Sequence, residues 1–122
     1  MKSTLPVFAL VIIFILSACH DEQNIEWGTI NLTDTKYSIK LETRFNDGHL
    51  SYIIRMFPDD GNLIRLANTV TVELLDREHF LLGIIEPESW ARNNDIVSTR
   101  GRISFTRSNY RALGAWNVKW RY

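Results

Sequence analysis

Alternation of apolar and polar side chains dominates the chain after residue 36. Between residues 37 and 45 the odd positions carry Tyr, Ile, Leu, Thr and Phe, while the even positions carry polar or charged side chains. Period-two alternation is typical of a strand that buries one face. The turn Asn46-Asp47-Gly48 follows, and the alternation then resumes through Leu50, Tyr52, Ile54 and Met56. The sequence therefore predicts an antiparallel hairpin across this turn.

Further segments are typical of short strands at hairpin spacing. Residues 68–75 are rich in β-branched side chains, residues 76–79 form a polar turn, and the apolar run 80–85 ends before Pro87. This order predicts a second hairpin. Residues 88–94 lack alternation, and we expect a helical turn around Trp90 there. Two further strands are predicted, one through Ile103 and Phe105 and one through Trp116, Val118, Trp120 and Tyr122.

These segments together predict the fold class. No window shows helical spacing over three turns, and six or seven short strands after residue 28 favour an all-β antiparallel sandwich or small barrel over residues 29–122. The segment from Val70 to Leu82, a β-run followed by an acidic turn and an aromatic residue, resembles immunoglobulin-like domains of bacterial envelope proteins. The resemblance implies a sandwich.

The first eighteen residues are typical of an export signal and stand apart from the domain. Lys2 precedes an apolar run over residues 5–16, and Ser17-Ala18 closes the segment. A bilayer-spanning helix needs roughly 20 apolar residues, so this run is too short to be one. Residues 1–18 therefore read as a signal peptide.

The end of that segment, Leu16-Ser17-Ala18-Cys19, resembles the lipobox of bacterial lipoproteins. The resemblance implies a diacylglyceryl group on the Cys19 thiol, cleavage before Cys19 and a further acyl chain, such as palmitate, on the new amino group. Two or more acyl chains hold a protein stably on a bilayer. In the enteric lipoproteins that this motif resembles, an aspartate directly after the cysteine tends to retain the protein at the inner membrane. The resemblance therefore implies that His20 at this position favours the outer membrane, with the domain facing the periplasm. Residues 19–28 are then expected to be a polar tether. A plain secretory signal, or a cysteine buried in the core, is the alternative.

The overall charge is balanced but its distribution is not. Lys and Arg number 14 and Asp and Glu 14, which argues against a nucleic-acid partner. Residues 19–90 hold 6 basic and 13 acidic side chains, whereas residues 91–122 hold 7 basic side chains and Asp95 alone. The basic segment predicts either an anionic partner (lipid headgroups, a polysaccharide or an acidic protein) or cross-strand ion pairs with acidic early strands. The residues predicted to contact a partner are Trp90, Arg100, Arg102, Arg107 and Arg111.

Motifs for catalysis are missing from the sequence. The single cysteine excludes an internal disulfide, and no nucleotide-binding loop, zinc-protease motif or serine-hydrolase motif occurs. His20, His49 and His79 have no partner at metal-ligand spacing, and Asp59-Asp60 lacks the rest of a calcium loop. We therefore expect no enzyme, no metal and no cofactor, but a binding module that contacts the membrane through the lipid on Cys19. A carrier of small ligands or glycans with an aromatic-lined cleft is the alternative, and a hydrolase using Asp and Glu has no positive support.

Overall fold

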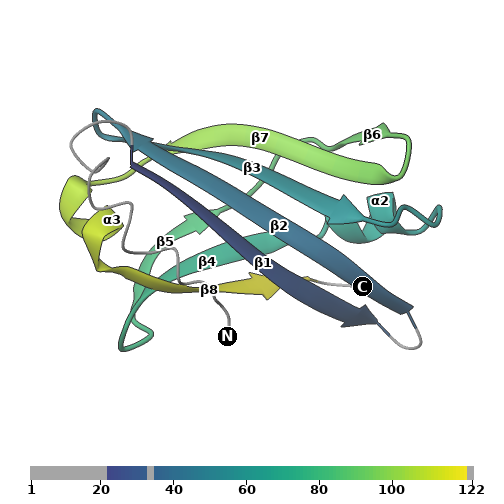
Figure 1. Cartoon of the computed structure of the whole chain (residues 1–122), viewed down its shortest axis with the longest axis horizontal. Helices are drawn as coiled ribbons and strands as arrows, with labels where there is room; N and C mark the ends of the chain where they lie inside the picture. The colour runs from purple at the N-terminus through teal and green to yellow at the C-terminus, as the bar shows by residue number, and fades with distance from the viewer. Residues whose placement is uncertain (1–21, 33–34, 121–122) are drawn as a thin grey trace.

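The structure is a computed structural model that describes residues 22–32 and 35–120, which form two antiparallel β-sheets (Figure 1). The larger sheet has five strands in the order β1-β2-β3-β7-β6, and the smaller has three in the order β5-β4-β8. Two short helices, α2 and α3, lie at opposite ends of the molecule. The predicted all-β sandwich is confirmed, and the sheets do not close into a barrel. The strands are β1 (Glu22–Leu32), β2 (Thr35–Asn46), β3 (His49–Phe57), β4 (Thr71–Asp76), β5 (Leu81–Ile85), β6 (Ala91–Asn93), β7 (Ile96–Ser104) and β8 (Leu113–Lys119).

The hairpin predicted from the alternation is confirmed as β2 and β3. The two strands pair from Ser38 opposite Phe57 to Asn46 opposite His49. Between them, Asp47 and Gly48 take the positive φ angles of 49° and 79° that a tight turn requires. Every second side chain of β2 from Tyr37 onward is buried, as the period-two pattern predicted.

The second hairpin and the terminal strand are also confirmed. β4 pairs with β5 on one side and with β8 on the other. Glu73, for example, lies between Ile84 of β5 and Asn117 of β8. The terminal strand is therefore part of the smaller sheet, and Tyr122 lies outside the described residues.

The structure differs from the sequence prediction in several details. Residues 22–28, which we expected in the tether, belong to β1 and pair with β2. The helical turn expected around Trp90 is absent, since residues 86–90 are irregular and β6 follows them. The described chain thus has eight strands, and it also has two unpredicted helices, α2 (Leu63–Ala67) and α3 (Arg107–Ala112).

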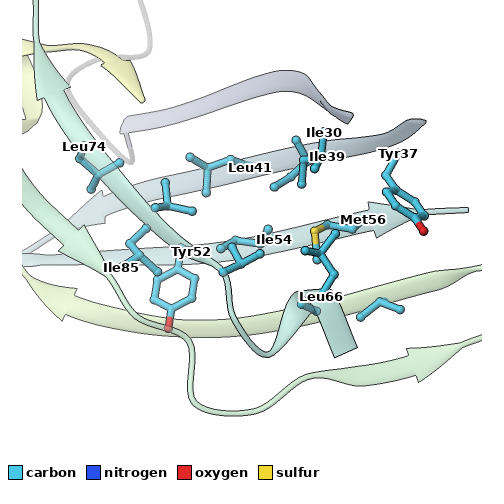
Figure 2. Packing of buried hydrophobic residues seen from close by; sticks show 14 of the residues in the cluster. Ile30, Tyr37, Ile39, Leu41, Tyr52, Ile54, Met56, Leu66, Leu74 and Ile85 are labelled. Carbon is cyan, nitrogen blue, oxygen red and sulfur yellow. The ribbon is translucent and has the colours of Figure 1, made fainter. Parts of the chain in front are cut away.

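The core fills the space between the two sheets (Figure 2). The larger sheet contributes side chains from β2 and β3, among them Ile39 and Ile54, while Leu74 and Ile85 come from the smaller sheet. All four are at most 1% exposed. The helix α2 closes one end of this core with the buried side chains Leu63, Leu66 and Ala67.

The turn before α2 is tied to the larger sheet by Asp60. Its carboxylate accepts hydrogen bonds from the backbone N–H groups of Asn62 and Leu63, which begin the helix, and from the hydroxyl of Tyr37 at 2.6 Å. The Tyr37 hydrogen bond is the largest cause that holds the pKa of Asp60 below its usual value.

Candidate binding surface

The outer face of the five-stranded sheet gathers most of the basic side chains of the early and middle strands. Burial alternates along β2, β3 and β7, so the intervening positions of these strands point away from the core. We call the six cationic side chains on this side the basic face: Lys36, Lys40, Arg44, Arg55, Arg100 and Arg102. Glu42 is the one carboxylate at the described strand positions of the same side.

The strand register decides which side chains are neighbours on this face. Arg44 lies opposite Ser51 of β3, and Ser51 lies opposite Arg102 of β7. Arg100 lies opposite Ile53. Within the described residues, Arg44, Arg100 and Arg102 form no ion pair with a carboxylate. Since neighbouring strands are about 4.8 Å apart, Arg44 and Arg102 stand about 10 Å from each other along the hydrogen-bonding direction.

Glu42 is shared by two of the cations. Its carboxylate forms an ion pair with the guanidinium of Arg55 and another, at 3.5 Å, with the ammonium of Lys40. Burial raises the pKa of Glu42, but the Arg55 hydrogen bond and the charges of Lys40 and Arg55 outweigh it and leave the pKa lowered. Glu42 therefore stays ionised and compensates only part of the positive charge around it.

Exposed apolar side chains lie at the β1 edge of the basic face. Trp27 is 62% exposed and Ile25 46% exposed. The Trp27 ring packs edge-on against Phe57 at 6.4 Å between centroids, and the Lys40 ammonium lies 5.1 Å from the Trp27 ring centroid. This edge thus combines an exposed indole ring with a cation above it.

The structure brings together only two of the five predicted partner residues. Arg100 and Arg102 share the outer face of β7, two positions apart. Arg107 and Arg111 lie on α3 instead, where the Arg107 guanidinium stands 5.1 Å from the ring centroid of Phe45. The four predicted arginines are therefore divided between β7 and α3.

The fifth predicted partner residue, Trp90, packs against the core. It is half-buried, and its Nε1 is buried with no hydrogen-bond partner among the described atoms. The neighbouring carbonyl of Ser89 accepts a hydrogen bond at 2.6 Å from the Thr99 hydroxyl of β7, which fixes this segment over the sheet. Trp90 thus covers the core, as a loop tryptophan with a structural role would.

Ion pairing within the fold explains part of the charge asymmetry, but not the arginines of β7. Lys119 of β8 pairs with Glu73 of β4 at 3.1 Å, and Arg92 of β6 pairs with Asp59 at 2.6 Å. The neighbours of Arg100 and Arg102 on β3 are uncharged. Many acidic side chains lie instead in turns and loops, among them Asp47, Asp59, Asp60, Glu78, Glu86, Glu88 and Asp95.

The residues that the sequence did not single out for binding are Trp27, Lys40, Arg44 and Arg55. The alternation of β2 already placed Lys40 and Arg44 on one face. Trp27 was assigned to the tether, and its position beside Lys40 follows from the pairing of β1 with β2. The order of the strands, which puts β3 beside β7, joins these side chains to Arg100 and Arg102.

Other features of the described residues offer less chemistry. A hollow of about 290 Å³ is lined by Asn68, Thr69, Val70, Thr71, Glu86 and Pro87, and none of these residues is aromatic. Within the described part of the chain, no three His, Cys, Asp or Glu side chains are grouped to hold a metal ion. No helix in residues 22–32 or 35–120 is long and apolar enough to span a bilayer. Cys19 lies outside the described residues.

Comparison with known proteins yields no relative: the chain matches no protein-family model, no curated protein and no solved structure. The inference of function therefore depends on the sequence motif at Cys19 and on the basic face.

Proposed function

We propose that this chain is a lipid-anchored binding module of the bacterial cell envelope, facing the periplasm and acting without catalysis, whose basic face binds an anionic component of that envelope. The observation that carries the proposal is the segregation of charge: at the described strand positions, six cations and one carboxylate share the outer side of one sheet.

The basic face contributes little to the stability of the fold. Like charges on neighbouring positions of a sheet are destabilising, and three of the arginines have no ion pair within the described residues that would offset this effect. Arginine binds phosphate and carboxylate groups through two parallel hydrogen bonds, so an anionic partner would supply the missing contacts. Binding therefore accounts for the arrangement better than folding does.

The anchor is tested by mass and by location. Mature protein is purified from membranes beside a Cys19→Ser variant, and both are weighed intact and fractionated. We expect the wild-type mass to show loss of residues 1–18 and gain of acyl chains, and the variant to be unacylated. A cleaved, unacylated and soluble wild type would contradict the anchor.

The binding face is tested by charge reversal. The mature protein in detergent is eluted with salt from phosphocellulose, a simple anionic polymer. We expect Arg100→Glu/Arg102→Glu to elute at a clearly lower salt concentration than wild type. Arg65→Glu/Arg111→Glu, which changes the net charge equally at exposed positions of α2 and α3, is the matched control and should shift elution less. Equal shifts in both pairs would mean that net charge, and not the basic face, determines binding.

A further inference from the structure

The position of β1 relative to Cys19 limits how far the basic face can be from the lipid. Glu22, the first residue of β1, is three residues after Cys19. A chain spans at most about 3.3–3.6 Å per residue, so the Cα atoms of the two residues are within about 11 Å of each other. That distance is close to the screening length of roughly 8 Å at physiological salt, so charges at this end of the sheet are within reach of a charged membrane surface.

Arg44 and Arg102 lie at this end of the basic face. Gln23 of β1 lies opposite Arg44, and the line continues through Ser51 to Arg102. Both arginines are exposed. Arg44 and Arg102, which form no ion pair within the described residues, are therefore at the end of the basic face that the anchor holds closest to the bilayer.

The apolar part of the same face is also on β1. Ile25 and Trp27 are both largely exposed, and Lys40 lies over the Trp27 ring. Tryptophan with flanking cations is typical of surfaces that lie at the level of lipid headgroups, where the ring is in contact with the acyl boundary and the cation with phosphate. A purely ionic partner would give no reason for an indole ring at 62% exposure on the strand that leads from the anchor.

The distribution of the cations on the basic face suits a surface that carries many separate anionic groups. The cations are distributed over the three strands β2, β3 and β7, and the hollow of about 290 Å³ described above lies elsewhere, at residues 68–71 and 86–87. Separate cations on a sheet suit an array of separate phosphates better than one small anion, which binds where several donors converge.

From these observations we infer that the anionic partner of the basic face is the phospholipid surface itself. Resting on the proposed function, this inference places the outer side of β1, β2, β3 and β7 against the membrane that holds Cys19, with Trp27 at headgroup level. The outer side of β4, β5 and β8 then points away from the membrane.

The orientation is tested by cysteine labelling in vesicles. Because the thiol of Cys19 is blocked by the anchor, a single new cysteine reports on one position of the mature, lipidated protein. Ser51→Cys lies on the basic face, and Asn117→Cys is the matched exposed position on the other sheet. Each variant is reconstituted into vesicles of phosphatidylethanolamine and phosphatidylglycerol, and its rate of reaction with a water-soluble maleimide is divided by the rate in detergent.

We expect Ser51→Cys to react roughly fivefold more slowly on vesicles than in detergent, and Asn117→Cys at an unchanged rate. The protection should be lost in vesicles of phosphatidylcholine alone, in high salt, and when Arg100→Glu/Arg102→Glu is added. The fluorescence of Trp27 gives a second readout, obtained as the difference between the wild type and Trp27→Phe. Brominated lipids should quench this fluorescence in the anionic vesicles only.

The failures of the two proposals are distinguishable. If elution from phosphocellulose depends on Arg100 and Arg102 while Ser51→Cys reacts freely on anionic vesicles, the basic face has a soluble anionic partner and the membrane inference is overturned. If elution does not depend on these arginines, the proposed function itself fails. Protection in phosphatidylcholine vesicles equal to that in anionic vesicles would also overturn the inference, because the charges would then have no part in it.

Discussion

Reversing the charge of Arg100 and Arg102 is expected to stabilise the protein while it weakens binding. The two side chains are two positions apart on β7, so their Cα atoms are about 7 Å from each other. Two unit charges at about 7 Å in water repel by about 0.6 kcal/mol, and screening at physiological salt lowers this to about 0.3 kcal/mol. Two glutamates would still repel each other, so any gain must come from their other neighbours.

Those neighbours are cationic. Arg55, diagonally across from Arg100, and Arg44, in line with Arg102, would each gain an opposite charge on the same face. Cross-strand pairs of opposite charge contribute about 0.2–1 kcal/mol when adjacent and less at these distances. We therefore expect Arg100→Glu/Arg102→Glu to raise the free energy of unfolding by about 0.5 kcal/mol, which corresponds to a rise in Tm of about 2–4 °C for a domain of this size.

The assay is urea and thermal unfolding followed by circular dichroism, in low and in high salt. The gain should decrease in high salt, since it is electrostatic. Arg65→Glu/Arg111→Glu serves as the control for net charge, as in the elution experiment. A clear loss of stability in the β7 variant at low salt would refute the reasoning, because it would mean that Arg100 and Arg102 make stabilising contacts within the fold.

Three further predictions test the core and the turn before α2. Gly101→Ala should destabilise the fold by about 1–3 kcal/mol in urea unfolding, because its new Cβ would lie 2.5 Å from the hydroxyl oxygen of Tyr52; an unchanged midpoint would contradict this close packing. Leu74→Ala, at a side chain with 0% exposure, should cost about 2–5 kcal/mol, and a cost below about 1 kcal/mol would mean that the site collapses around the smaller residue. Asp60 has a folded-state pKa below the unfolded value, so its stabilising contribution is complete above the unfolded pKa and is lost as the pH falls through the folded pKa. Tyr37→Phe removes the main cause, so unfolding measured against pH should show a weaker loss on acidification; an unaltered profile would assign the acid sensitivity to other groups.

The sequence predicted the parts of the fold that local pattern determines. The alternation from Tyr37 to Met56 and the Asp47-Gly48 turn specify a hairpin whatever the rest of the chain does. β1 escaped prediction for a physical reason: it is an edge strand, and its inward positions before Ile30 carry Asn24, Glu26 and Gly28, so the apolar alternation is absent.

The candidate binding surface was only half predictable, because it depends on strand order. The excess of arginine after residue 90 is visible in the sequence, and Arg100 and Arg102 do lie on one exposed face. The strand that lies beside β7 is determined by contacts between distant parts of the chain. In the structure, uncharged Ser51 and Ile53 of β3 lie opposite Arg102 and Arg100, whereas predicted cross-strand ion pairs would need carboxylates at these positions. Trp90 packs against the core, and a lone tryptophan in an irregular segment carries no periodicity that distinguishes a core side chain from an exposed one.

The pairing of β1 also has a mechanical consequence. β1 pairs with β2 from Glu22 opposite Phe45 to Leu32 opposite Thr35, and β2 is its single neighbour in the described sheet. A pull on Glu22 along the strand axis loads all of these hydrogen bonds at once, whereas a pull perpendicular to the sheet loads the first pair alone and then each next pair in turn. A domain anchored through β1 would therefore strongly resist a force parallel to the membrane. Under a force directed away from the membrane, β1 would separate from β2 one residue pair after another, beginning at Glu22.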